Sequence, residues 1–362
     1  MATITTTAAV QTEFEAPLVV DELELPDPRQ DQVRVKLLSS GVCHSQLHQM
    51  HNPNTPRPGL LGHEGTGIVT DVGAGVTHLQ EGDKCIVTWV PRTQVDRRMM
   101  GQPTGATFRG EPAMGAVYTW SKDVLTSGAL VVPIPDEHPD DVSCIVGCAV
   151  LTGAGAVLNT AKVRPGESVA VFGVGGVGLS AIKAAALVNA YPIIAVDLAD
   201  EKLEFAKSFG ATHTVNAGGN TDPVEEIREI TGGGVDYAFD AIGVRQTAEQ
   251  ILPATRGGSA GAGNEGGVAV LIGIPPDEMT VDPRLFMMTQ RQYRGSLGAT
   301  YPDTDFPMFL RWHKEGKFPL DQLITRRYKL EDINQACDDL HGGKILGRDR
   351  KSTRLNSSHQ II

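Results

Sequence analysis

Cysteine, positive charge and long apolar runs are scarce in this 362-residue chain, and each shortage argues against a class of protein. Its five cysteines, at positions 43, 85, 144, 148 and 337, are too few and too scattered for a disulfide framework. The formal net charge of −11 argues against nucleic acid or an anionic membrane as the main partner. No apolar run reaches the roughly 18 residues that span a bilayer, and the first residues lack a basic stretch followed by an apolar core. We therefore expect a cytoplasmic protein that binds neither nucleic acid nor membrane.

Glycine is abundant, with 41 residues, and 41% of the chain is hydrophobic. A chain of this length can form two compact domains, each with an apolar core. Many glycines suit an α/β protein in which the backbone approaches a ligand closely.

The first part of the chain is β-rich. Residues 33–38 alternate as a half-buried strand does, and residues 65–72 follow the same pattern. Residues 91–116 show no clear periodicity and are interpreted as a long loop.

From about residue 150, short apolar strands alternate with helices. Such alternation predicts a parallel sheet wound by right-handed crossovers. Residues 257–267 are a glycine-rich loop to which no chemistry is assigned, and residues 294–347 are expected to return to the first domain. The predicted strands are 167–172, 193–196, 213–216, 235–240 and 267–274. One predicted helix follows the glycine loop at 173–178 and extends to about residue 189, and the others cover 199–209, 223–230 and 245–254.

The end of the chain differs from the rest. Residues 349–359 (DRKSTRLNSSH) have no apolar periodicity and resemble the translation of a sequencing-adapter remnant. A natural polar tail is the alternative. We predict that residues 349–362 are a non-native tail that packs against nothing.

A dinucleotide-binding motif, GVGGVG, follows a predicted strand and opens a helix. Gly173 permits the tight turn, Gly175 lets the backbone approach a pyrophosphate, and Gly178 allows close helix–strand packing; Gly176 and Val177 complete the loop. Asp197 ends the next strand, where a carboxylate would accept hydrogen bonds from ribose hydroxyls. No arginine lies within 198–201, so the pattern favours NAD over NADP, and Lys202 is a further candidate cofactor-binding residue. The alternative is an ordinary turn with a helix-capping aspartate.

Three potential metal ligands lie beside glycines. Cys43 is in GVCHS, His63 in GHEG and Cys148 in GCA. Two thiolates and one imidazole would leave a tetrahedral zinc ion with one open position, as a catalytic site requires. The spacing is not that of a zinc finger, and Cys148 as a core residue or His63 as a buried structural histidine remain alternatives.

Several motifs together resemble the medium-chain zinc alcohol dehydrogenase family. They are GVCHS, GHEGTGIVTDVGAGV, EGDKC, VGCAVLTGAGAV and SVAVFGVGGVG, in an order that extends from about residue 8 to residue 348. The resemblance implies an α/β fold in which a GroES-like β-rich catalytic domain (1–155 and 293–348) is split around a doubly wound Rossmann domain (156–292).

The resemblance also implies a role for each matching residue. Cys43, His63 and Cys148 match the ligands of the catalytic zinc, and Glu64 matches a carboxylate beside it. The other matches are Ser45 as the hydroxyl that hydrogen-bonds the alcohol, His48 as the outer member of a proton relay, His44 as a contact of the cofactor pyrophosphate, and Trp89 as a wall of the substrate pocket or a packing residue.

The chain departs from the family pattern at two places. Gln46 stands where relatives often have an aspartate that supports the ligand histidine; its amide could still accept from the imidazole N–H. Residues 86–143 contain no cysteine, so we expect one catalytic zinc per chain and no structural zinc. We also expect Arg348 to lie near Glu64.

The resemblance thus predicts an NAD-linked zinc enzyme that oxidises a primary or secondary alcohol, or reduces an aldehyde or ketone in reverse. Alternatives are a polyol or amino-alcohol dehydrogenase of the same superfamily and a catalytically silent NAD(H)-binding protein. The intact ligand set with Ser45 and His48 disfavours the silent protein and a zinc-free quinone reductase. A homodimer or homotetramer is expected.

Overall fold

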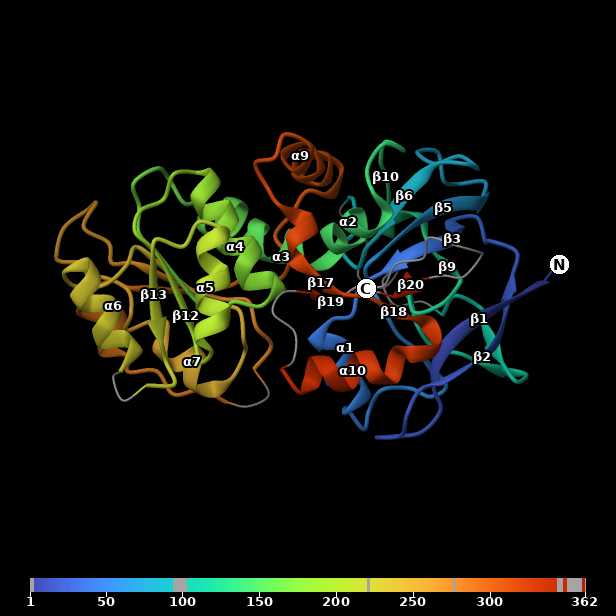
Figure 1. Ribbon diagram of the computed structural model, residues 1–362, viewed down its shortest axis with the longest axis horizontal. Helices are drawn as coiled ribbons and strands as arrows, with labels where there is room; N and C mark the ends of the chain where they lie inside the picture. The colour runs from blue at the N-terminus through green and yellow to red at the C-terminus, as the bar shows by residue number, and fades with distance from the viewer. Residues whose placement is uncertain are drawn as a thin grey trace. The chain divides into compact units, whose positions relative to one another are not determined.

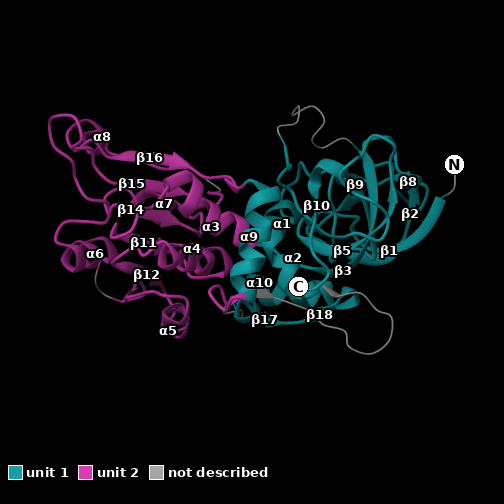
Figure 2. Cartoon of the chain, turned by 90° about the horizontal axis from the view of Figure 1, so that it is seen from above, with its two compact units in different colours: residues 1–148, 301–314, 320–362 teal, residues 149–300, 315–319 magenta. Residues whose placement is uncertain are grey.

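The computed structural model describes residues 3–93, 103–219, 222–275, 278–343, 348–349 and 360–361. The chain divides into two compact units, coloured separately in Figure 2. Unit 1 comprises residues 1–148, 301–314 and 320–362, and unit 2 comprises residues 149–300 and 315–319.

Unit 1 is built on sheets whose strand pairs are mainly antiparallel. One sheet has the strand order β4-β1-β2-β7-β8, and a second has the order β10-β6-β5-β3-β20-β18, with β9 also paired to β3. The strands are β1 (Thr3–Gln11), β2 (Val19–Pro26), β3 (Gln32–Ser40), β4 (Gly59–Leu60), β5 (Gly65–Val72), β6 (Lys84–Val87), β7 (Thr107–Phe108), β8 (Glu111–Pro112), β9 (Asp123–Ser127), β10 (Val131–Pro133), β18 (Tyr328–Lys329) and β20 (Gln360–Ile361), and β17 (Ile324–Arg326) pairs with β19 (Arg348–Asp349). The predicted strand at 65–72 is confirmed, and the predicted strand at 33–38 lies within β3.

Two hydrophobic clusters form the core of unit 1. One is enclosed by the strands and includes Leu23, Leu25 and Val35. The other joins residues 9–61 to residues 330–340, because α10 (Ile333–His341) packs beside α1 (His44–Met50), as Figure 1 shows. Among its described residues, the other α-helices of unit 1 are α2 (Asp140–Ile145) and α9 (Pro302–Lys314).

The structure corrects the expectation of a featureless loop over residues 91–116. Within its described part, β7 and β8 form a short hairpin with a two-residue loop, and β7 pairs with β2. Arg109 (φ 52°) and Gly110 (φ 83°) both have positive φ, the backbone that a tight hairpin turn needs. Arginine is an uncommon residue at such a position, which explains why the turn was missed.

The expectation that the end of the chain packs against nothing is also wrong. Gln360–Ile361 pairs in parallel with Ser39–Ser40 of β3 and antiparallel with β18, and Arg348–Asp349 pairs with β17. The backbone alone provides these ladder hydrogen bonds, so polar sequence does not prevent them. Residues 350–359 lie outside the described residues.

One continuous helical stretch, Asp140–Ala161, is long and apolar enough by composition to cross a membrane. It consists of α2, a π-helical segment (Val146–Val150), α3 (Leu151–Gly155) and a second π-helical segment (Ala156–Ala161). Because 83% of its apolar window is buried inside the structure, it has the burial of a core helix.

Unit 2 contains a six-stranded parallel sheet. Its strand order is β13-β12-β11-β14-β15-β16, which is 3-2-1-4-5-6 in chain order, the arrangement of doubly wound dinucleotide-binding sheets. The elements are β11 (Val169–Phe172), α4 (Gly176–Leu187), β12 (Ile193–Asp197), α5 (Asp200–Ser208), β13 (His213–Asn216), α6 (Pro223–Thr231), β14 (Tyr237–Asp240), α7 (Arg245–Gln250), β15 (Val268–Leu271), α8 (Arg284–Met287) and β16 (Gln292–Gly295).

The predicted elements of unit 2 are found with modest shifts at their ends. The largest shift is at the helix predicted for 245–254, whose regular part ends at Gln250. Pro253 explains the early end, because proline has no N–H to donate and restricts the residue before it.

Candidate metal centre and cofactor loop

The pairing of β3 with β5 brings Cys43 and His63 together. Ser40 at the end of β3 is opposite Gly65 at the start of β5. Cys43 comes three residues after the first strand and His63 two residues before the second. Antiparallel pairing therefore places both residues at the same end of the sheet.

A buried hydrogen-bond network ties the two turns to each other. The Ser40 and Thr119 hydroxyls both donate to the Glu64 carbonyl, at 3.0 and 3.1 Å, and the Gly41 N–H donates to the same oxygen. The Trp120 indole N–H donates to the Gly41 carbonyl at 2.9 Å. These contacts limit the movement of both turns, but the sequence carries no local signal for them because they join segments far apart in the chain.

Cys148 comes from the helical stretch 140–161 and lies in its first π-helical segment. The helix approaches the sheet closely at Gly147, where a Cβ atom would lie 3.0 Å from the Val87 carbonyl oxygen. The Thr88 hydroxyl donates to the Gly147 carbonyl at 2.7 Å and anchors the helix at this point. π-Helical turns often occur at functional sites, because they redirect one side chain out of helical register.

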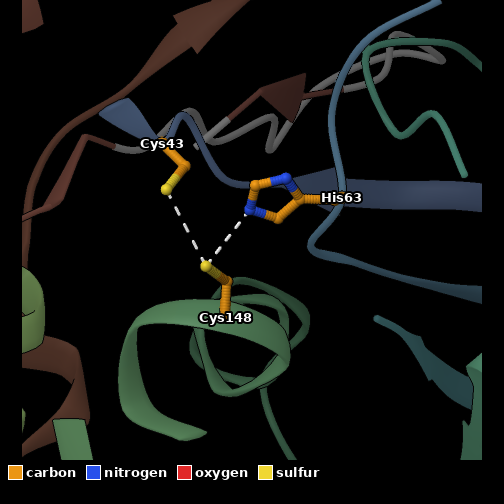
Figure 3. Close-up of side chains that lie close together, drawn as sticks. All are labelled: Cys43, His63 and Cys148. Carbon is orange, nitrogen blue, oxygen red and sulfur yellow. Dashed lines mark hydrogen bonds between the residues drawn. The ribbon is translucent and has the colours of Figure 1, made fainter. Parts of the chain in front are cut away.

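Figure 3 shows the three side chains pointing toward one another. The Cys43 and Cys148 sulfurs are 3.8 Å apart, and His63 Nε2 is 3.2 Å from the Cys148 sulfur. The three ligand atoms lie within 4.8 Å of one another. Tetrahedral zinc with Zn–S bonds near 2.3 Å would separate two sulfurs by about 3.8 Å, so the donor set fits this ion.

No other group of this kind is found among the residues that the structure describes. Cys85 is completely buried, its thiol donates to the Gly67 carbonyl, and burial raises the pKa of that thiol well above its usual value. Cys85 therefore stays protonated and is not available as a thiolate ligand.

Four of the other predicted site residues lie next to a ligand in the chain or on α1, which follows Cys43. The Ser45 hydroxyl donates to the Cys43 sulfur at 3.2 Å, and Glu64 is completely buried next to His63 in the chain. His44 and His48 are exposed on α1, one at its start and the other one turn later.

Trp89 packs against the ligand histidine. Its ring is edge-on to His63 with centroids 6.4 Å apart, and its indole nitrogen is buried without a hydrogen-bond partner. The position is compatible with the predicted pocket wall. The side chain of Arg348, expected near Glu64, lies outside the described residues.

Gln46 contacts His63 in a way that differs from the expectation. Its amide oxygen accepts from the Gly62 N–H, and its amide nitrogen is 2.6 Å from His63 Nδ1. The expected acceptor at the imidazole is therefore replaced by a donor, because the only acceptor atom of the amide is taken by the backbone.

The glycine loop of unit 2 has the geometry that its sequence predicts. Gly173 has a φ of +88°, and a Cβ on Gly178 would lie 1.8 Å from the Gly173 carbonyl oxygen. Gly175 caps the N-terminus of α4, and a Cβ there would meet nothing within 4 Å. The Asp197 carboxylate accepts from the Val174 N–H at 3.0 Å, and Lys202 is half-buried in the first turn of α5.

These features define a dehydrogenase class: a dinucleotide-type sheet with a glycine loop, and a β-rich unit with a Cys-His-Cys metal site. Comparisons with known proteins agree. The family models "Zinc-binding dehydrogenase" and "Alcohol dehydrogenase GroES-like domain" match residues 176–315 and 29–136. The S-(hydroxymethyl)glutathione dehydrogenase of Paracoccus denitrificans is 33% identical, over 94% of this chain and 98% of its own length.

Solved structures show the same likeness. The alcohol dehydrogenase zinc-binding domain protein from Burkholderia ambifaria superposes with a TM-score of 0.87 at 32% identity, covering 97% of this chain and all of that one. The benzyl alcohol dehydrogenase from Acinetobacter calcoaceticus gives a TM-score of 0.85 at 31% identity, with 96% and 100% coverage. The chain therefore belongs to the medium-chain zinc-dependent alcohol dehydrogenase family and is an oxidoreductase, and the predicted fold class is confirmed.

Proposed function

We propose that the protein oxidises a primary or secondary alcohol with NAD, or reduces the corresponding aldehyde or ketone in the reverse direction. The observation that carries the proposal is the convergence of Cys43 Sγ, His63 Nε2 and Cys148 Sγ at spacings suited to one zinc ion. When bound, zinc would supply a Lewis acid and the nicotinamide would accept the hydride.

The residues of the chain itself would bind the metal and move the proton. Cys43, His63 and Cys148 would hold zinc, and the buried Glu64 carboxylate would add negative charge beside the site. The Ser45 hydroxyl would accept the proton that leaves the alcohol and pass on its own hydroxyl proton, so that it stays neutral. His48, one turn later on the same face of α1 and exposed, would pass it to solvent.

The cofactor would be held by the second unit. The helix N-terminus behind Gly173, Gly175, Gly176, Val177 and Gly178 would bind the pyrophosphate, and Asp197 would accept from the ribose hydroxyls. We further propose that His44 contacts the pyrophosphate, that Lys202 contributes to the cofactor site and that Trp89 lines the substrate pocket.

Three further expectations from the sequence are also proposals. They are a cytoplasmic location, a homodimer or homotetramer, and the functional domain limits 1–155, 156–292 and 293–348. The non-native origin of residues 349–362 also remains a proposal.

Zinc content should be close to one per chain. The segment 86–143 has no cysteine, so we propose that the structural zinc of many relatives is missing here. Elemental analysis of protein that has been equilibrated with zinc and then rapidly desalted measures the ratio directly. Two tightly held zinc ions per chain would contradict the single-site proposal.

A pair of glycine variants should separate cofactor binding from folding. Gly178→Ala should lower the melting temperature markedly, because its Cβ would collide with the Gly173 carbonyl. Gly175→Ala should fold normally, because its Cβ meets open space, but should weaken NADH binding if the pyrophosphate approaches this residue. Melting curves and NADH fluorescence titrations test both, and unchanged NADH affinity in Gly175→Ala would contradict the proposed loop function.

A substrate panel tests the activity itself. Turnover of ethanol, benzyl alcohol and sorbitol with NAD, each with and without prior zinc removal, separates an alcohol dehydrogenase from a polyol dehydrogenase. Zinc-dependent turnover of ethanol or benzyl alcohol is expected. NADH binding with no turnover of any alcohol would indicate the silent binding protein instead.

A further inference from the structure

The side chain of Gln46 is buried between two groups that compete for it. It is 3% exposed and lies in α1, close to both Gly62 and His63. Its Oε1 accepts from the Gly62 N–H at 2.5 Å, and its Nε2 lies 2.6 Å from His63 Nδ1.

The backbone contact determines which way the amide faces. A backbone N–H can only donate, so the amide oxygen must face Gly62 and the NH₂ group must face the imidazole. An amide nitrogen also only donates, so Nδ1 must accept in this arrangement. The proton of the neutral imidazole is then on Nε2, the atom that lies 3.2 Å from the Cys148 sulfur.

Metal binding requires the opposite arrangement of the ring proton. A neutral histidine that binds a metal through Nε2 carries its proton on Nδ1 and donates it to an acceptor. With Gln46 as it lies, that proton would face the amide NH₂, so two donors would meet. If the amide turned over, its NH₂ would instead meet the Gly62 N–H. In either orientation, Gln46 Oε1 can accept from only one of the two donors, the Gly62 N–H or the His63 Nδ1–H. The other donor is left buried without an acceptor, which costs free energy.

We propose that Gln46 is a positioning residue that disfavours the metal-binding form of His63 and so makes zinc bind less tightly and exchange faster than the Cys-His-Cys ligands alone would dictate. This inference rests on the proposed role of His63 as a zinc ligand. Its consequence is a site whose occupancy responds to the available zinc.

Two variants of matched length test the inference. Gln46→Glu offers two acceptor oxygens, one for each donor, and should slow zinc release and tighten zinc binding by about tenfold or more, the scale on which such outer partners act. Gln46→Met keeps the length but has neither polar group, so it should fall well short of the glutamate variant. Chelator competition gives the zinc affinity and stopped-flow release gives the rate, neither of which depends on turnover.

A spectroscopic measurement on the wild-type protein keeps the inference testable even if a variant fails to fold. The ¹⁵N chemical shifts of His63 in zinc-free protein should report the proton on Nε2 and an accepting Nδ1. A proton on Nδ1, or equal zinc release from wild type and Gln46→Glu, would overturn the inference, as would equal gains in the methionine and glutamate variants. If the inference fails but the wild-type protein still binds one zinc ion, the proposed function stands. If the wild-type protein binds no zinc, both the inference and the proposed function are contradicted.

Discussion

Cys148→Ala should reduce alcohol turnover by on the order of 10³-fold and should abolish tight zinc binding. The loss corresponds to several kcal/mol of transition-state stabilisation, the contribution expected from a Lewis-acidic metal at about 1.4 kcal/mol per factor of ten. NADH binding should persist, because the glycine loop and its parallel sheet belong to unit 2, which has its own core. Steady-state turnover, elemental analysis and an NADH titration of the same preparation measure the three quantities.

Cys144→Ala is the matched control. Cys144 precedes Cys148 by about one turn of the same helical stretch and is also buried, but its thiol donates to the Asp141 carbonyl and it does not belong to the three-residue group. It should keep zinc and most of its turnover, with only a loss of stability. Near-normal activity in Cys148→Ala would show that this cysteine is structural and would refute the ligand assignment.

Asp197→Gly combined with Leu198→Arg should move cofactor preference toward NADP by at least about tenfold in kcat/KM, equivalent to about 1.4 kcal/mol. The aspartate would repel a 2′-phosphate, and an arginine can pair with it in a bidentate contact. Leu198 is 69% exposed, so a longer charged side chain can be accommodated there. Kinetics with both cofactors test the change, and a wild type that already prefers NADP would contradict it.

Asp197→Asn tests how much of the cofactor preference comes from the negative charge of Asp197 and how much from its hydrogen bonds to the backbone. The Asp197 carboxylate accepts from the Val174 and Leu198 N–H groups at 3.0 and 2.8 Å, so its loss also loosens the glycine loop. Asparagine keeps one acceptor oxygen and removes the charge. If repulsion dominates, Asp197→Asn should already improve the use of NADP. Its melting temperature should fall modestly, because the Val174 and Leu198 N–H groups donate to different carboxylate oxygens and asparagine keeps only one acceptor.

The sequence predicted those parts of the molecule whose signals are local. The parallel sheet of unit 2 follows from the alternation of apolar strands and helices, and the glycine loop follows from its spacing and from Asp197 at the end of the next strand. Cys43, His63 and Cys148 were candidates because of their residue types and glycine neighbours, and the family resemblance grouped them.

The features that were missed depend on contacts between distant segments or on backbone conformation. The orientation of the Gln46 amide follows from the Gly62 N–H, and no pattern in the sequence encodes that contact. The hairpin at 107–112 has arginine at a position where glycine or asparagine is usual. Gln360–Ile361 pairs through backbone hydrogen bonds with a strand that is more than 300 residues earlier in the chain, and no local pattern encodes that contact.

The second hydrophobic cluster of unit 1 has a consequence for the order in which the protein folds during synthesis. Val42, adjacent to the metal site, belongs to a cluster that is completed by Leu330, Ile333 and Leu340. Asn334 also hydrogen-bonds both the N–H and the carbonyl of Leu18, across 316 residues.

The sheet of unit 2, by contrast, lies within a single stretch of chain, residues 149–300. Since domains tend to fold as they leave the ribosome, that sheet can form while the core beside Val42 still lacks its last helix. Zinc capture by a nascent chain should therefore be a late event, after residue 340 has emerged. A ribosome-stalled chain that ends before α10 should bind NADH but retain little zinc.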